Sequence, residues 1–231
     1  MKEINIKSFT HFHEQMQSYD SAADIYRGVT DKKYQLIPKI GRIPMRVGHT
    51  RKVEEGRMFR RFVERAIPYL DFMPRNDWEW LATAQHYGLP TRLLDWTRNP
   101  LVALYFAVEH KTHKDSAVYV LKGYQVLSTE MHENPFEYSK VGKFVPHRIN
   151  PRISAQIGVF TIHPELEEPL LSDDIDKLII ANEMRNDLKK VLDMYGINRA
   201  TLFPDLDGLT QHIAWQRTAI YFSVNETKEG R

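Results

Sequence analysis

The chain has 231 residues, of which 42% are hydrophobic and 27% charged, and it contains no cysteine. A chain of this length suits one large domain or two very small ones, and a core of the larger size needs neither a disulfide nor a metal to be stable. The absence of cysteine excludes disulfide frameworks, thiol nucleophiles, cysteine-ligated zinc and iron–sulfur clusters. The N-terminus lacks the apolar run of a signal peptide, and no stretch approaches the roughly 20 apolar residues of a membrane span. We therefore expect a cytoplasmic protein without a membrane segment.

The formal net charge of +2 is the sum of two opposed segments. Between residues 39 and 75 there are ten Lys/Arg residues and four Asp/Glu, whereas residues 165–187 contain eight acidic residues and two basic ones. The basic segment could attract a phosphate-bearing partner. Alternatively, it is a solvated helix face that the acidic segment of the same chain neutralises.

Apolar periodicity in the first ninety residues predicts short strands and helices in alternation: a strand at 4–6, a helix at 11–19, a strand at 23–28 and helices at 59–67 and 78–84. Residues 30–49 are interrupted by proline and glycine and should be irregular. Pro68 should end or kink the helix predicted over 59–67. Asp77 is the expected N-cap of the helix predicted over 78–84, and Gly88 its end.

The centre of the chain predicts a strand over residues 90–97 with a polar end, followed by Asn99 as N-cap and Pro100 in the first helical turn. The helix over 101–108 is apolar on nearly every side and should be buried. Further elements follow in order: strands at 117–121, 156–162 and 178–181, and helices at 188–195, stopped by Gly196, and 205–215. This irregular alternation, without repeats or linkers, predicts a single α/β or α+β domain over residues 1–231.

Three clusters contain residues that packing explains poorly. The first is Tyr26-Arg27-Gly28, where an apolar strand ends in an arginine beside a glycine. A guanidinium binds phosphate or carboxylate through two parallel hydrogen bonds, and glycine lets a ligand or another backbone approach closely. The alternative is a surface arginine that precedes an ordinary turn.

The second cluster is the segment 85–97, with the sequence QHYGLPTRLLDWT. Gln85, His86, Arg92, Asp95 and Thr97 are polar groups within an apolar region, and burial requires that each finds a partner. The strand leads into a helix N-terminus, where free N–H groups and the helix dipole favour an anion. In the alternative interpretation, Arg92 pairs with Asp95 and Thr97 only caps the helix.

The third cluster surrounds Gln156 and Gly158, which would share one face of the strand predicted over 156–162 and leave space beside the glutamine amide. A structural strand with a small-residue notch explains these residues equally well. The histidines at 11, 13, 110 and 113 lack a third ligand at metal-binding spacing, so we expect no metal site. No phosphate-binding loop, dinucleotide-binding glycine fingerprint or nucleophile elbow is present.

These motifs resemble the FRG domain family, which is named after its F/Y-R-G motif. The resemblance rests on Tyr26-Arg27-Gly28 and on the segment 85–97 with the apolar helix after it. Segments 152–160 and 202–208 continue it, so that it covers roughly residues 20–215.

The layout also resembles ADP-ribosyltransferases of the arginine–serine–glutamate type. That resemblance implies an α+β fold with a mixed-sheet core flanked by helices and a cleft that binds NAD. It implies that Arg27 contacts phosphate, Thr97 the ribose, and Gln156 the ribose hydroxyls or an acceptor. The family's catalytic glutamate would fall at Gly158, which has no carboxylate, so Asp95 is the expected substitute.

The resemblance therefore implies two functions. As an enzyme, the chain would transfer ADP-ribose from NAD, or hydrolyse NAD, as a bacterial toxin or anti-phage effector. As a binding module, it would use the same pocket for a nucleotide, nucleic acid or protein partner without chemistry. In both cases Tyr26, Gly28, Gln85, His86 and Arg92 are expected to help bind the nucleotide, and a protein or nucleic-acid acceptor would lie near the basic segment 39–75. Gln85, His86 and Arg92 could either line the cleft or brace it from behind, and both hypotheses require Arg27, Asp95 and Gln156 to meet in one cleft.

Overall fold

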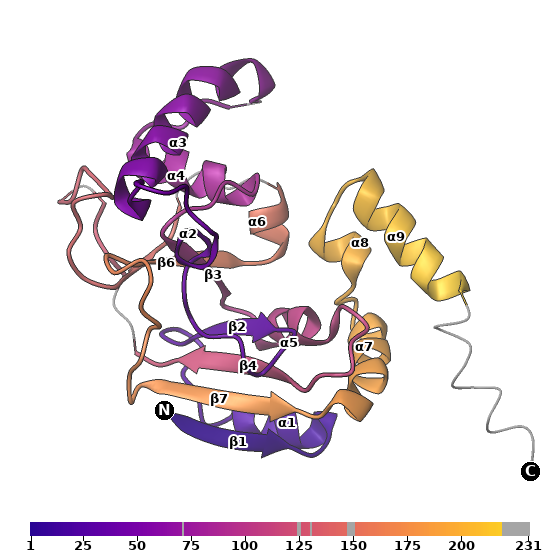
Figure 1. Ribbon diagram of the computed structural model, residues 1–231. Coiled ribbons are helices and arrows are strands. Elements are labelled where there is room, and N and C mark those ends of the chain that lie inside the picture. Colours follow the sequence, from indigo (N-terminus) through magenta and orange to yellow (C-terminus); the bar gives the residue numbers. More distant parts are fainter. Residues whose placement is uncertain (71, 124–125, 130, 147–150, 219–231) are drawn as a thin grey trace, which may run out of the picture.

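The computed structural model describes residues 1–218 except 71, 124–125, 130 and 147–150 (Figure 1). The described strands form one seven-stranded sheet in the order β1-β7-β4-β2-β3-β6-β5. The strands are β1 (Lys2–Ile6), β2 (Ile25–Val29), β3 (Leu93–Thr97), β4 (Ser116–Leu121), β5 (Gly142–Phe144), β6 (Gly158–Ile162) and β7 (Ile175–Ile180). The α-helices are α1 (Phe9–Met16), α2 (Lys39–Arg42), α3 (Arg51–Ala66), α4 (Asp77–His86), α5 (Pro100–Val108), α6 (Pro151–Ala155), α7 (Arg185–Met194), α8 (Arg199–Leu202) and α9 (Leu206–Arg217). Two 3₁₀ turns are η1 (Ile67–Tyr69) and η2 (Asn182–Met184).

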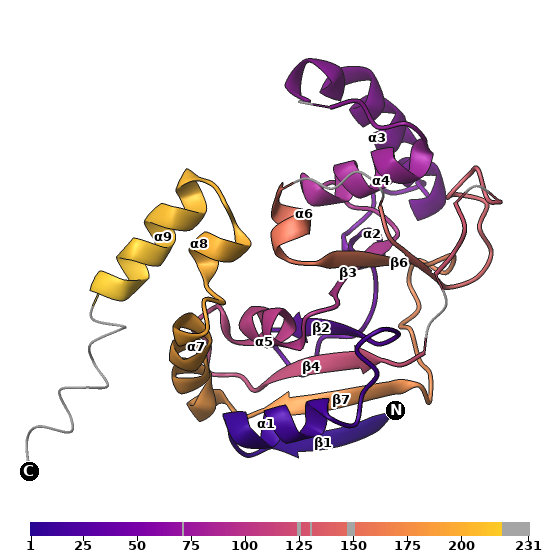
Figure 2. The same ribbon diagram turned by 180° about the vertical axis from the view of Figure 1, so that it is seen from behind.

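The sheet is mixed, and it divides between β2 and β3. β1 pairs with β7 in parallel and the remaining neighbours are antiparallel. Within the described residues, β2 and β3 share a single backbone pair, Tyr26 with Thr97. Figures 1 and 2 show β3 and β6 set apart from the β1-β7-β4-β2 group. The predicted α+β fold with a mixed sheet flanked by helices is therefore confirmed.

Each group of strands has helices packed on it. Buried side chains of β1, β2, β4 and β7 pack against α1, α5 and α7, with Phe12 and Tyr105 among the largest. On the other group, α3, α4 and α6 cover β3, β5 and β6 around Trp78 and Phe144. A third cluster, which contains Trp96 of β3, joins the two groups. The predicted single domain over residues 1–231 is compatible with this continuous sheet and stays a prediction.

Gly28 shows why β2 carries a glycine beside Arg27. A Cβ atom at this position would lie 1.9 Å from the carbonyl oxygen of Ala103 and 2.6 Å from the backbone nitrogen of Ala107. Any side chain would therefore overlap the backbone of α5, which packs directly on β2. Of the two partners expected to approach this glycine closely, a ligand or another backbone, the structure shows the backbone of α5.

Several predicted boundaries are confirmed and others are wrong. Asn99 caps α5 through a hydrogen bond from the Leu101 N–H, and α5 is buried as expected. Gly196 follows α7 with a φ of 74°, the left-handed conformation that glycine favours. The N-cap of α4 is Asn76, not Asp77, because the Asn76 side chain accepts from the Glu79 N–H. Helix α2 lies within the segment expected to be irregular, and α6, α8 and β5 were not predicted.

Candidate functional site

The predicted site residues gather where β2 and β3 diverge. Side chains alternate along a strand, so Asp95 and Thr97 share one face of β3 while Trp96 packs into the core. On β2, Arg27 follows Tyr26, the residue that pairs with Thr97. The single shared pair between the two strands therefore brings the two polar motifs together.

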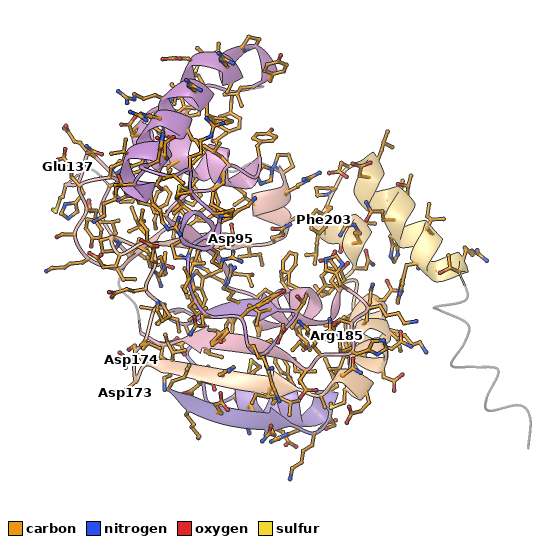
Figure 3. All side chains as sticks on the ribbon, in the orientation of Figure 1. Asp95, Glu137, Asp173, Asp174, Arg185 and Phe203 are labelled. Atoms are coloured by element: carbon orange, nitrogen blue, oxygen red, sulfur yellow. The ribbon has the colours of Figure 1, made fainter. Side chains whose placement is uncertain are left out.

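A cleft with a volume of about 480 Å³ opens at this junction. Asp95 lines it from β3 and Phe203 from the end of α8, both labelled in Figure 3. The predicted residues that line the cleft are Tyr26, Arg27, Gly28, His86, Asp95, Thr97 and Gln156. Arg27, Asp95 and Gln156 thus meet in one cleft, as both hypotheses require. Their roles in binding or catalysis stay predictions.

Arg27 and Asp95 form an ion pair across the divergence of the two strands. One terminal nitrogen of Arg27 donates to the backbone carbonyl of Asp95 and lies 3.7 Å from the Asp95 Oδ2 atom. The Arg27 side chain is 19% exposed, whereas that of Asp95 is 58% exposed. Burial lowers the pKa of the Arg27 guanidinium, and the Asp95 carboxylate opposes this shift. The pair presents a fixed cation and an accessible carboxylate to the cleft.

Gln85 braces this pair from behind. Its Nε2 donates to the Asp95 Oδ2 over 2.9 Å, and its Oε1 accepts from the Thr91 hydroxyl over 2.6 Å. Because both ends of the amide are engaged, Gln85 fixes the orientation of the Asp95 carboxylate. Gln85 does not line the cleft.

Arg92 lies outside the cleft and is not paired with Asp95, so the interpretation that joined these two residues is wrong. Arg92 is 3% exposed, and its Nε and a terminal nitrogen donate to the Glu55 Oε2 over 3.0 and 2.8 Å. Its backbone N–H also donates to the Glu55 Oε1 over 2.6 Å. The sequence did not reveal this partner because Glu55 belongs to α3, 37 residues earlier in the chain. Arg92 therefore braces the fold, with Glu55 as its counter-ion.

The predicted strand over 156–162 begins at Gly158, so Gln156 does not share a strand face with that glycine. Gln156 lies in the turn between α6 and β6, where the next residue, Ile157, has a φ of 49°. Its backbone carbonyl accepts from the Thr97 hydroxyl over 2.6 Å, and its Nε2 donates to the Leu202 carbonyl over 3.0 Å. The tight turn, rather than strand alternation, places Gln156 at the cleft.

The Thr97 hydroxyl is occupied within the protein. It donates its proton to the Gln156 carbonyl and accepts from the Asn99 N–H over 3.0 Å. Thr97 is also only 4% exposed. Its main role in the structure is to tie the end of β3 to the α6–β6 turn and to the start of α5.

Among the described residues, two carboxylates line the cleft, and one of these two is open to a ligand. Glu109, at the end of α5, has a side chain 9% exposed and forms an ion pair with Arg199. Asp95 is the exposed carboxylate. At Gly158 a Cβ atom would lie 3.0 Å from the Ile153 side chain, so α6 occupies the space beside this glycine. A negative charge for chemistry in the cleft would therefore come from Asp95.

Sequence reasoning did not single out several other groups that line the cleft. Arg42 is exposed on α2, and its charge is close enough to lower the pKa of Arg27. Its signal was its place in the basic segment 39–75. The aromatic rings of Tyr34, Phe106 and Phe203 come from three separate parts of the chain, and those of Phe106 and Phe203 meet edge to face at 6.1 Å. Only the tertiary structure brings these rings to the cleft.

His86 lines the cleft, in surroundings that favour its neutral imidazole. Burial lowers the pKa of its imidazole, and the Arg152 guanidinium lowers it further, while Asp95 opposes the shift. A histidine with a lowered pKa is uncharged at neutral pH and can accept a proton. His86 is therefore available as a base next to the Arg27–Asp95 pair.

His163 makes the stability of the site region depend on pH. It is 2% exposed, and its Nε2 lies 2.8 Å from the Thr161 hydroxyl, which accepts from the Trp96 indole. Burial, and secondarily the Arg27 charge, lowers its pKa from 6.5 to about 4.

Because the unfolded chain binds this proton more tightly, His163 stabilises the fold fully above pH 6.5 and less as the pH falls toward 4. We expect the free energy of unfolding to fall by about 2 kcal/mol between pH 7 and pH 5 through this residue. Urea denaturation of wild type and His163→Gln at pH 7 and pH 5 measures this change in the free energy of unfolding. The exposed His113→Gln is the control, and an equal pH dependence in wild type and His163→Gln would refute the assignment.

Part of the basic segment has no acidic partner within the described chain. Arg51 pairs with Glu167 of the acidic segment at 2.9 Å, and Arg57 pairs with Glu54. Arg60, Arg61 and Arg65 are exposed on α3 and form no ion pair with any described residue. The acidic segment thus neutralises the basic one only in part. Asp71 of this segment lies outside the described residues.

Comparison with known proteins gives one match. Residues 22–116 match the FRG domain family. This stretch contains Arg27, Arg42, His86 and Asp95, whereas Gln156 lies beyond it. No curated protein and no solved structure matches the chain. No helix in the described part of the chain has the length and hydrophobicity for a membrane crossing.

Proposed function

We propose that this chain, which contains an FRG domain over residues 22–116, binds NAD in the cleft and cleaves the bond between nicotinamide and ribose. The observation that carries the proposal is the pairing of the partly buried Arg27 with the exposed Asp95 at the junction of β2 and β3. A guanidinium is suited to a diphosphate, and a carboxylate to a sugar cation. The likeness to ADP-ribosyltransferases is part of this proposal.

Binding would use the cations and aromatic rings of the cleft. The Arg27 and Arg42 guanidiniums repel each other, and a diphosphate between them would remove this repulsion. The rings of Tyr34, Phe106 and Phe203 offer flat apolar surfaces for a base or the nicotinamide ring. The amide oxygen of Gln156 has no partner among the described residues and could accept from a ribose hydroxyl.

Cleavage would proceed by electrostatic stabilisation. When the bond between ribose C1′ and the nicotinamide nitrogen breaks, its electron pair leaves with nicotinamide and positive charge develops on the ribose. The Asp95 carboxylate would stabilise this charge. Water, or a hydroxyl of an acceptor, then forms the new C1′–O bond and loses its proton, which His86 can accept. A hydrolase of this kind would deplete NAD in a cell, which accounts for the toxin or anti-phage role expected from the resemblance.

The second candidate function is binding without chemistry. Arg60, Arg61 and Arg65 favour it, because exposed cations without acidic partners attract a polyanion such as a nucleic acid. In the enzymatic hypothesis the same surface would bring an acceptor to the cleft.

Incubation with NAD, followed by chromatographic measurement of nicotinamide, tests the proposal. We expect release by wild type, and strong loss in both Arg27→Ala and Arg27→Lys, because lysine lacks the planar fork. Arg217→Lys is the matched control, since Arg217 is exposed at the end of α9. Circular dichroism establishes that each variant folds.

Thermal unfolding with NAD separates the two functions. Stabilisation of wild type without nicotinamide release, lost in both Arg27 variants, would support the binding module and refute the enzyme. Absence of both release and stabilisation would refute NAD as the ligand.

A further inference from the structure

Arg185 is a buried cation without a counter-ion. It lies at the first position of α7, is 5% exposed and forms no ion pair with any described residue (Figure 3). Its terminal nitrogens donate to the backbone carbonyls of Thr30 and His110 over 3.2 and 2.6 Å, and its buried Nε has no partner in the described part of the chain. Burial alone lowers the pKa of this guanidinium, with no carboxylate opposing it. A buried charge in this state is costly unless a ligand compensates it.

Arg185 lines a pocket with a volume of about 380 Å³ between the α5–β4 loop and α7. Lys111, His113 and Lys189 add positive or protonatable groups to the wall, and Asn186 adds an amide. Among the described residues that line this pocket, Glu109 is the only carboxylate, and Arg199 already forms an ion pair with it. Cations therefore outnumber anions among the described residues that line the pocket.

We infer that this pocket is a second anion site, which binds the phosphate or diphosphate group of a small molecule with Arg185 as its buried anchor. Two backbone carbonyls hold the guanidinium in place, so its orientation is set before the ligand arrives. Lys111 is exposed at the rim and supplies a second charge. The site is separate from the Arg27–Asp95 pair, although Glu109 and His110 line both cavities.

Isothermal titration with inorganic pyrophosphate at 150 mM NaCl tests the inference. We expect binding by wild type and an at least tenfold higher Kd for Lys111→Glu and for Arg185→Lys. Lys140→Glu, exposed and outside the pocket, is the control and should bind as wild type does. If Arg185→Lys fails to fold because its carbonyl contacts are lost, Lys111→Glu alone decides. No binding by wild type at millimolar pyrophosphate, or wild-type affinity in Lys111→Glu, would overturn the inference.

Arg27→Ala distinguishes this site from the proposed NAD site. In Arg27→Ala we expect any binding of pyrophosphate in the cleft to be lost, while binding in the Arg185 pocket persists and is still weakened at least tenfold by Lys111→Glu. Loss of binding in Arg27→Ala with no effect of Lys111→Glu would mean that the anion occupies the cleft instead. Failure of NAD to bind would leave the pyrophosphate result unaffected, so the two proposals fail separately.

Discussion

Replacing Asp95 by asparagine should reduce the rate of nicotinamide release on the order of 10²- to 10³-fold, the usual effect of removing one group that stabilises transition-state charge. The substitution preserves the shape of the side chain, and the asparagine oxygen can still accept from the Gln85 Nε2. It removes the only exposed carboxylate among the described residues that line the cleft. Because the charge matters only while the ribose becomes cationic, the affinity for NAD should change by less than a few-fold.

Single-turnover nicotinamide release and calorimetric titration of NAD measure the two effects separately. Asp173→Asn is the matched control, since Asp173 is fully exposed in the loop before β7, away from Asp95 in Figure 3. An Asp95→Asn protein that releases nicotinamide at the wild-type rate would show that Asp95 does not supply the charge. A large loss of NAD affinity with an unchanged rate would assign Asp95 to binding.

Replacing Glu55 by alanine should lower the free energy of unfolding by about 3–5 kcal/mol. Glu55 is 1% exposed and is the counter-ion of Arg92, which is itself 3% exposed. Without the carboxylate, the Arg92 guanidinium keeps only its hydrogen bond to the Phe136 carbonyl, a longer contact with the Pro135 carbonyl and its stacking on the Phe136 ring. A buried charge without its partner is strongly destabilising.

Urea denaturation of Glu55→Ala and of Glu54→Ala measures this effect. Glu54 is the preceding residue and pairs with His49 and Arg57 at the surface, so its loss should cost at most about 1 kcal/mol. The double variant Glu55→Leu/Arg92→Met should be more stable than Glu55→Ala, because it removes both charges and refills the space. Equal stability of Glu54→Ala and Glu55→Ala would contradict the assigned role of the pair.

The sequence predicted the start or end of a helix well where neighbouring residues alone set that boundary. Asn99 and Pro100 start α5, and Gly196 follows the end of α7, because capping and left-handed backbone depend on a few neighbouring residues. Gln156 shows the limit of such reasoning. Its segment alternates like a strand, but the turn at Ile157 separates it from β6.

Partners distant in sequence could not be predicted from local pattern. Arg92 was expected to line the cleft, to brace it from behind or to pair with Asp95, three residues away. It braces the fold through Glu55 of α3, a partner that the local pattern did not indicate. The sequence did not indicate Arg185 as a site residue. Arg185 is unusual because it is buried without a counter-ion among the described residues, and burial is a property of the folded chain. The resemblance expected over residues 117–215 lies outside the matched FRG stretch and stays a prediction.

The sequence by itself determined the composition class, a mixture of helices and strands, the FRG motifs and a candidate set of site residues: Tyr26, Arg27, Gly28, Gln85, His86, Arg92, Asp95, Thr97 and Gln156. All of these features depend on residue type and short-range spacing, which are the same in the folded and the unfolded chain. The tertiary structure alone decided which of these residues share the cleft, and that Gln85 and Arg92 stand behind it. It also decided that Gly28 admits the α5 backbone, and that the charge of Arg185 remains uncompensated. Proximity and burial arise only when segments far apart in sequence pack together, and they set both the electrostatics and the shape of a site.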